Sequence, residues 1–355
     1  MKQKKITIIL PSLKAGGAER VMSFVSQNLN RNKYNVTLLV LGYKADSVYN
    51  TDGVKTMFLN SSRLLYSLLE ITKYIFKKKP NIIISSVTHV NLFMAVLSFV
   101  FYKINFVARE ASVISTISEH SKSILANKYL IKFLYPRFKK IICQSEDMKE
   151  DLNLTYNLKK EKLVVINNPI TKIYPVKQKN LSINDPVKFI TVGRLSQEKG
   201  HERILKSLIN IKYDFKYCII GSGPLKNNLK ALVAELNLID KVTFIDYTNK
   251  VSEELSKADL FLQGSYVEGF PNAVLESCVV GTPVLAFNAP GGTKEIIKNN
   301  VTGYIVNSEQ EWLDKIEDIE HLVNMDPFIV SEFVKNKFSE IHILKKYEFL
   351  LENLN

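Results

Sequence analysis

Short apolar runs alternate with segments of helix length along the chain, and this order restricts the fold more than any other feature. In the first half the apolar runs are residues 6–10, 35–40, 54–59, 81–85, 104–108, 140–143 and 163–166. The helical patterns between them lie near 17–30, 62–78, 90–102, 119–135 and 146–153. Such alternation is typical of a mainly parallel sheet with helices on both faces.

The pattern stops once and then restarts. Residues 169–186 are rich in Pro, Lys and Asn and predict a linker. Beyond it the strand-like runs are 187–192, 217–220, 242–245, 260–263, 283–287 and 304–306. The sequence therefore predicts an α/β chain of two doubly wound, Rossmann-like domains, residues 1–168 and 187–340, with a C-terminal helix at 341–355 packing back toward the first. Ligands bind outside the carboxyl ends of parallel strands, so we expect the two domains to face each other across a cleft.

Composition excludes several other classes of protein. With 46% hydrophobic and 23% charged residues, the chain is neither disordered nor fibrous. Its three cysteines are far apart and predict no disulfide framework. Residues 80–102 carry no charge, but the first half of this stretch is too polar to cross a bilayer, so it predicts a buried strand followed by a buried helix. The N-terminus lacks a signal-peptide pattern, and we expect a cytoplasmic protein.

The positive charge is confined to one half of the chain. Residues 1–170 contain 26 Lys and Arg against 11 Asp and Glu, a net charge of +15, whereas the rest carries −2. Residues 73–79 and 121–140 interleave these basic residues with Ile, Leu, Phe and Tyr. This composition is typical of interfacial helices that contact anionic lipid, although ordinary amphipathic surface helices share it.

Two loops contain candidate phosphate-binding residues. Gly16 and Gly17 follow the first strand and begin a helix, whose free N–H groups would point toward an anion. Arg194 and Lys199 follow the first strand of the second domain, where a diphosphate would bind. A glycine in the first loop of an α/β domain, or a basic residue in any loop, can equally be structural.

A third segment, residues 266–284, is more specific. Glu268 and Glu276 stand eight residues apart, the first before a Gly-Phe-Pro turn and the second on the helix that follows. The apolar neighbours of Glu276 predict a buried carboxylate that needs a partner. An anion-binding helix start is predicted at the backbone amides of Gly269, Phe270, Asn272 and Ala273.

Six motifs in order carry a family resemblance. They are GGAER, VGRLSQEKG, GSGPLKNNL, EGFPNAVLE, GTPVLAF and PGGTKEII followed by GYIV. Together they resemble the family 4 retaining glycosyltransferases of the GT-B fold over nearly the whole chain. SSVTHVNLFMAVL, VARE and QSEDMKEDL further resemble the subgroup that builds bacterial capsule, exopolysaccharide and O-antigen (lipopolysaccharide) repeat units.

The resemblance implies roles for individual residues. Arg194 and Lys199 would hold the donor diphosphate, Glu276 the ribose hydroxyls, and Glu268 a hydroxyl of the transferred sugar. Gly16 would lie against the donor phosphate or the acceptor. His89 stands roughly where some members have a histidine that positions the reacting sugar, although a lone histidine beside a core helix is more often structural.

The implied reaction is the transfer of a hexosyl or N-acetylhexosaminyl group with retention of configuration. The donor would be a nucleoside diphosphate sugar, best matched by a UDP-sugar, and the acceptor an oligosaccharide or a polyprenyl-diphosphate-linked sugar at the inner face of the membrane. No Asp-x-Asp motif or metal-ligand cluster occurs in the sequence, so we expect no metal and no cofactor.

Two other functions remain compatible with parts of the sequence. A non-hydrolysing nucleotide-sugar epimerase could use the same fold, but it would need more acid and base residues in its site. A non-catalytic protein that binds anionic lipid or nucleic acid would explain the basic half. It would leave the motifs of the second domain without a purpose, and no nucleic-acid recognition signature is present.

Overall fold

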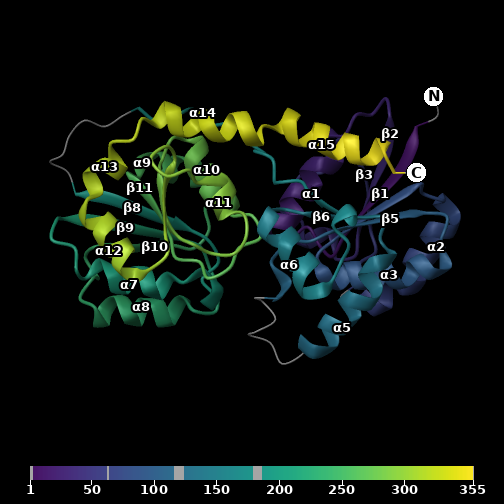
Figure 1. The fold of residues 1–355 in the computed structure, drawn as a ribbon, viewed down its shortest axis with the longest axis horizontal. Helices are drawn as coiled ribbons and strands as arrows, with labels where there is room; N and C mark the ends of the chain where they lie inside the picture. The colour runs from purple at the N-terminus through teal and green to yellow at the C-terminus, as the bar shows by residue number, and fades with distance from the viewer. Residues whose placement is uncertain (1–2, 62–63, 116–123, 179–185, 355) are drawn as a thin grey trace. The chain divides into compact units, whose positions relative to one another are not determined.

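The computed structural model describes residues 3–61, 64–115, 124–178 and 186–354. The chain divides into two compact units, and each is described by itself (Figure 1). Unit 1 comprises Met1–Thr171 and Glu340–Asn355, and unit 2 comprises Lys172–Ser339.

Unit 1 contains a seven-stranded sheet in which every neighbouring pair is parallel. Its strands are β1 (Lys4–Leu10), β2 (Tyr34–Val40), β3 (Lys55–Phe58), β4 (Ile82–Ser86), β5 (Asn105–Arg109), β6 (Lys140–Cys143) and β7 (Leu163–Val165). Their order is β3-β2-β1-β4-β5-β6-β7, so the direction of winding reverses between β1 and β4. Ligands of such sheets bind near this reversal, outside the strands' carboxyl ends.

Helices cover both faces of this sheet. They are α1 (Gly17–Asn28), α2 (Leu68–Lys78), α3 (Thr88–Val100), α5 (Ile124–Leu134), α6 (Glu146–Tyr156) and α15 (Glu340–Glu352). Short 3-10 turns lie at Lys44–Asp46, Leu64–Ser67, Tyr135–Arg137 and Lys160–Lys162. In Figure 1, α1 and α15 lie on one face of the sheet, and α2, α3, α5 and α6 lie on the other.

The C-terminal helix α15 belongs to the core of unit 1. Its buried residues Ile343, Tyr347 and Leu351 join the same hydrophobic cluster as Val21 and Val25 of α1. Burial of a large apolar side chain stabilises a fold by roughly 1.5–3 kcal/mol. The last residues of the chain therefore complete the first unit.

Unit 2 repeats the architecture with six parallel strands in the order β10-β9-β8-β11-β12-β13. The strands are β8 (Val187–Val192), β9 (Phe215–Ile220), β10 (Val242–Ile245), β11 (Leu260–Gln263), β12 (Val284–Phe287) and β13 (Gly303–Val306). The helices are α7 (His201–Leu208), α8 (Lys226–Glu235), α9 (Val251–Lys257), α10 (Asn272–Val279), α11 (Thr293–Ile296), α12 (Glu309–Glu317), α13 (Ile319–Val323) and α14 (Pro327–Phe338). A 3-10 turn lies at Gln197–Lys199. The core includes Trp312, which stacks on Phe287 at 4.5 Å between ring centroids.

The predicted strands and the two Rossmann-like domains are confirmed, because each of the thirteen apolar runs coincides with a strand. Residues 169–178 of the predicted linker form neither helix nor strand, and 179–185 lie outside the described residues. The predicted helix at 119–135 is described from residue 124 onward, as α5.

The prediction of a buried helix after β4 was wrong for one of its faces. Val90 and Met94 of α3 are buried, but Val96, Phe99 and Val100 are 52%, 49% and 62% exposed. Apolar composition alone does not show whether a second layer covers a helix. Among the described residues, no helix has the length and apolar character needed to span a bilayer.

Candidate active site

The candidate site of unit 2 lies where the loops after β8 and β11 meet. Gly200 has a φ of +59°, and a Cβ atom there would lie 1.8 Å from the carbonyl oxygen of Gly264. Both glycines therefore allow two backbone segments to approach more closely than any side chain would permit. The Tyr266 N–H donates to the Glu198 carbonyl at 2.8 Å and joins the same loops again. This contact brings Lys199 next to Glu268.

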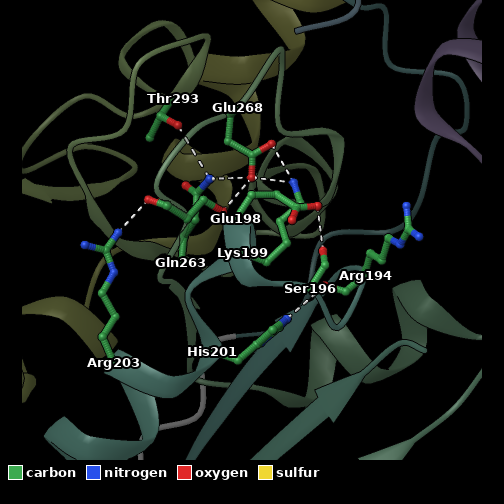
Figure 2. A network of polar contacts seen from close by, with 10 residues as sticks. Arg194, Ser196, Glu198, Lys199, His201, Arg203, Gln263, Glu268 and Thr293 are labelled. Atoms are coloured by element: carbon green, nitrogen blue, oxygen red, sulfur yellow. Dashed lines mark hydrogen bonds and ion pairs between the residues drawn. The ribbon is translucent and has the colours of Figure 1, made fainter. Parts of the chain in front are cut away.

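Lys199 and Glu268 form the central ion pair of the site (Figure 2). The Lys199 ammonium lies 2.7 and 2.8 Å from the two carboxylate oxygens. The Glu268 side chain is only 8% exposed and that of Lys199 27%. A carboxylate this buried requires a partner, and the lysine supplies one.

Two further side chains hold the Glu268 carboxylate. The Ser265 hydroxyl donates to Oε1 at 2.6 Å, and the Gln263 amide donates to the same oxygen at 3.3 Å. The Gln263 amide also lies 3.5 Å from the Thr293 hydroxyl. Oε1 is thus surrounded by donors, whereas Oε2 accepts only from Lys199 within the described part of the chain. Oε2 retains capacity for a substrate hydroxyl.

Arg203 of α7 fixes the backbone that carries this network (Figure 2). Its guanidinium donates to the carbonyl oxygens of Gly264 at 2.6 Å and Ser265 at 2.5 Å. It also lies over the rings of Tyr266 and Phe287, at 4.2 and 3.8 Å from their centroids. Burial lowers the pKa of Arg203, yet the group remains a cation at neutral pH.

The Gly-Phe-Pro turn after Glu268 is tied to a second turn at residues 290–292. The Glu268 N–H donates to the Pro290 carbonyl, and the Gly292 N–H to the Gly269 carbonyl, both at 2.9 Å. The Phe270 ring is buried and packs edge-on against Phe338. These contacts place the start of α10, including Asn272 and Ala273, beside the ion pair. The first amides of a helix have no intrahelical partner and favour anions.

The other predicted residues of unit 2 surround this centre. Glu276 lies on α10 and is half-buried, so its carboxylate is less enclosed than the apolar neighbours in the sequence predict. Arg194 is exposed, and its guanidinium lies outside the network in Figure 2. The Arg194 carbonyl lies 3.1 Å from Nε2 of the buried His201. Burial lowers the pKa of His201, which is therefore neutral at pH 7 and holds the Arg194 loop as a hydrogen-bond donor.

Gly16, Gly17 and His89 belong to unit 1, at the carboxyl edge of its sheet. The two glycines stand at the start of α1, and His89 lies exposed in the first turn of α3. Neighbouring protein atoms exclude water from part of the imidazole and lower the pKa of His89. Val87, two residues before it, has a φ of 72°. This conformation is strained for a β-branched residue and is commonest at functional sites.

Sequence reasoning missed Gln263, Ser265, Arg203 and His201. None of them belongs to a charged pair or a spaced motif, and each acts through a backbone or loop contact that only the fold creates. Within the described residues, no group of three His, Cys, Asp or Glu side chains could hold a metal ion. The three cysteines are free thiols.

Comparison with known proteins assigns both halves of the chain to one class of enzyme. The family described as "Glycosyltransferase Family 4" matches residues 15–172, and "Glycosyl transferases group 1" matches residues 175–327. The chain belongs to the glycosyltransferases. This membership confirms the predicted family and decides against an epimerase or a non-catalytic binding protein.

Relatives of this glycosyltransferase share most of its length. One is the Campylobacter jejuni N-acetylgalactosamine-N,N'-diacetylbacillosaminyl-diphospho-undecaprenol 4-alpha-N-acetylgalactosaminyltransferase, 28% identical over 335 residues, which are 87% of each chain. Another is the Erwinia amylovora amylovoran biosynthesis glycosyltransferase AmsD, 26% identical over 95% of this chain and 93% of the relative.

Solved structures confirm the predicted GT-B fold of this glycosyltransferase. HepE of Anabaena, in complex with UDP and glucose, matches with a TM-score of 0.81 at 19% identity, over 99% of this chain and 100% of HepE. The apo form of the lipopolysaccharide outer core galactosyltransferase WaaB matches with a TM-score of 0.78 at 17% identity, over 98% of each chain.

Proposed function

We propose that the protein transfers a sugar, with retention of configuration, from a UDP-sugar to a lipid-linked or oligosaccharide acceptor during bacterial surface polysaccharide synthesis. The observation that carries the proposal is the buried Lys199–Glu268 pair beside the start of α10. The names of the Campylobacter and Erwinia relatives and the UDP bound to HepE support it.

In the proposed reaction, negative charge accumulates on the departing nucleoside diphosphate as its bond to the anomeric carbon breaks. The ammonium of Lys199, the guanidinium of Arg194 and the amides at the start of α10 stabilise that charge. Lys199 and the first amides of α10 are already positioned by the loops after β8 and β11, so they need little reorganisation during the reaction. Removal of either basic side chain should therefore lower turnover rather than donor binding alone.

Glu268 and Glu276 orient the donor in this proposal. Oε2 of Glu268 accepts a hydroxyl of the transferred sugar, and the half-buried Glu276 accepts the ribose hydroxyls. Retention follows from attack on the same face as the leaving group, whose phosphate oxygen takes the proton of the acceptor hydroxyl. The balance of this step requires no protein nucleophile and no metal ion.

Three measurements test the proposal. A thermal-shift panel of UDP-, GDP- and ADP-sugars identifies the donor, since a ligand at 100 times its dissociation constant stabilises the folded protein by about 2.7 kcal/mol. Release of nucleoside diphosphate only after an acceptor is added then demonstrates transfer. Full activity in EDTA is expected, whereas activity lost in EDTA and restored by magnesium or manganese would contradict the metal-independent step.

We also propose that unit 1 contacts an anionic membrane surface through α2, α3 and α5. The three helices cover one face of the sheet, and the rings of Phe76 and Phe101 join α2 to the end of α3 at 4.8 Å (Figure 1). Arg137, just after α5, lies 4.4 Å from the Phe99 ring of α3. We call the outer face of these helices the aromatic face.

The aromatic face combines exposed apolar side chains from three neighbouring helices, and contiguous apolar patches of this kind mark interaction sites. Those exposed by at least 44% are Leu69 and Phe76 of α2, Val96, Phe99, Val100 and Tyr102 at α3, and Tyr129, Leu130 and Phe133 of α5. Exposed lysines alternate with them, namely Lys73, Lys77, Lys78, Lys79, Lys103, Lys128, Lys132 and Lys139. Lys140 differs from the prediction, because it is half-buried and donates to the Glu161 carbonyl. Mixed aromatic and basic residues suit the boundary of an anionic bilayer.

Liposome flotation at low and high salt tests the membrane proposal. Each lysine near the surface adds about 1 kcal/mol and is screened within a Debye length, so binding to anionic vesicles should fall as salt rises. Changing Lys77, Lys78 and Lys79 to Glu should release the protein. The control changes Lys212, Lys230 and Lys250 of unit 2 to Glu, with the same change in charge. Equal recovery with neutral and anionic vesicles, or equal behaviour of the two triple variants, would refute membrane contact.

A further inference from the structure

The loop at the start of α1 is already occupied by protein groups. The Gly16 N–H donates to the Tyr49 hydroxyl at 3.0 Å, and the same hydroxyl donates to the Gly16 carbonyl at 2.9 Å. A phosphate could bind the Gly16 N–H only by displacing Tyr49. The Gly16 N–H therefore already has a protein partner, the Tyr49 hydroxyl, where a phosphate oxygen would otherwise bind.

Gly16 is required for space rather than for backbone conformation. Its φ of −161° is extended, and any residue could adopt it. A Cβ atom on Gly16 would, however, lie 2.2 Å from Oε2 of Glu19. The Glu19 carboxylate thus folds back over the helix start and fills the space that a side chain at position 16 would take.

The surroundings of Glu19 favour a carboxylate that meets a ligand. Glu19 is half-buried; burial raises its pKa, while its own backbone N–H and the charge of Arg109 lower it. Arg109 is fully buried at the end of β5 and donates to Asn168 at 2.6 Å. Among the described residues, its Nε–H has no partner. A buried cation and a half-exposed carboxylate thus stand together at the carboxyl edge of the sheet, where ligands bind.

We infer that Glu19 binds a hydroxyl of the acceptor sugar and that residue 16 is glycine so that this carboxylate can lie over the helix start. An ionised carboxylate only accepts hydrogen bonds and repels a diphosphate, whether of the donor or of a lipid-linked acceptor, so its partner is a sugar hydroxyl. The inference rests on the proposed function, which places the donor groups in unit 2. It assigns Gly16, through Glu19, to the acceptor side of the reaction.

Four variants test this inference: Glu19→Gln, Gly16→Ala, the double variant and the control Glu202→Gln. Glu202 lies at the start of the helix after β8, the matching place in unit 2, but it is exposed and paired with Lys206. Gly16→Ala displaces only the flexible end of a side chain, so its melting temperature should match that of the wild type. The substrates are the UDP-sugar selected by thermal shift and a short-chain polyprenyl-diphosphate N-acetylhexosamine.

Glu19→Gln and Gly16→Ala should each raise the KM for the acceptor by about ten- to a hundredfold, the effect of a lost hydrogen bond to a charged group. The KM for the donor should stay within about twofold in both. The acceptor KM of the double variant should equal that of the more impaired single variant, because each change takes the same carboxylate away from the acceptor. Glu202→Gln should behave as the wild type.

Other outcomes would overturn this inference and leave the proposed function standing. A raised donor KM in Gly16→Ala with a normal Glu19→Gln would assign the glycine to the donor phosphate. Additive effects on the acceptor KM in the double variant, or an unchanged acceptor KM in Glu19→Gln, would mean that Gly16 does not act through the Glu19 carboxylate. If the wild type transfers no sugar from any donor of the panel, the proposed function fails, and this inference fails with it.

Discussion

The Lys199–Glu268 pair allows a sharp test, because the same chain contains an equally short pair in a different environment. The Lys206 ammonium lies 2.6 Å from a Glu202 oxygen, close to the 2.7 Å of Lys199 and Glu268. The Lys206 and Glu202 side chains are 58% and 62% exposed, against 27% and 8%. If burial decides the energy of an ion pair, Lys199→Ala should destabilise unit 2 far more than Lys206→Ala.

The magnitudes follow from that exposure. Removing one partner of a fully buried pair costs about 3–5 kcal/mol. Because Lys199 is partly exposed and Glu268 keeps the donors Ser265 and Gln263, we expect about 2 kcal/mol for Lys199→Ala. In a unit of this size that lowers the melting temperature by about 4–8 °C. Lys206→Ala should cost at most about 0.5 kcal/mol.

The single tryptophan of the chain makes the measurement specific. Trp312 is fully buried in unit 2, so its fluorescence reports the unfolding of that unit. Adding Glu268→Gln to Lys199→Ala should raise the melting temperature again, because a neutral amide is less costly to bury than an unpaired carboxylate. Equal melting temperatures for Lys199→Ala and Lys206→Ala, or further destabilisation by the second change, would refute the reasoning.

The remaining predictions concern activity, pH and backbone strain. Arg194→Ala should lower turnover by roughly tenfold to a thousandfold with a normal melting temperature, and steady-state kinetics with saturating donor would reveal an unchanged rate if the assignment is wrong. Glu276→Ala should weaken the thermal shift by the UDP-sugar while leaving the fold intact; an undiminished shift would remove its role at the ribose. Burial lowers the pKa of His201 below its ordinary value of 6.5. As pH falls from 6.5 toward 5, the imidazole therefore binds a proton more readily in the unfolded chain than in the folded protein, and unit 2 should lose stability. Melting curves followed by Trp312 fluorescence should show a smaller loss of stability on acidification in His201→Gln than in the wild type. The control is His342→Gln, at an exposed histidine, and identical losses in the wild type and both variants would contradict the prediction. Val87→Gly should leave the melting temperature unchanged or raised, since it relieves a strained φ, whereas Val96→Gly within α3 should lower stability by about 1 kcal/mol; equal losses would mean that Val87 is unstrained.

The sequence was sufficient for the strands because parallel sheets buried on both faces need continuous apolar runs, and such runs are visible without any homologue. It was insufficient for α3, whose composition is equally apolar on its buried and exposed faces. The position of Phe99 in the sequence does not reveal that its side chain is 49% exposed among the described residues. Only the packing of the sheet decides that question.

For the candidate site, the charged residues could be predicted and their supports could not. Glu268 and Lys199 lie in motifs whose order is specific. Arg203 acts on the Gly264 and Ser265 carbonyls from about 60 residues away in sequence, and the Ser265 hydroxyl meets Glu268 only because of the turn between them. Similarly, a glycine at position 16 suggested an anion site, whereas the fold shows a carboxylate in the space beside it. A motif shows that residue 16 is small, but it does not show which atoms lie where a larger side chain would be.

The placement of α15 in the core of unit 1 has a consequence for synthesis on the ribosome. Residues 1–171 emerge first, yet their hydrophobic cluster lacks Tyr347 and Leu351 until the rest of the chain has been made. At about 5–20 residues per second, that interval is on the order of 10–40 s, and the first unit stays incomplete while unit 2 is synthesised. The nascent first unit would expose apolar surface throughout this delay and depend on chaperones. Helix α15, which is translated after unit 2, then determines when the first unit can close.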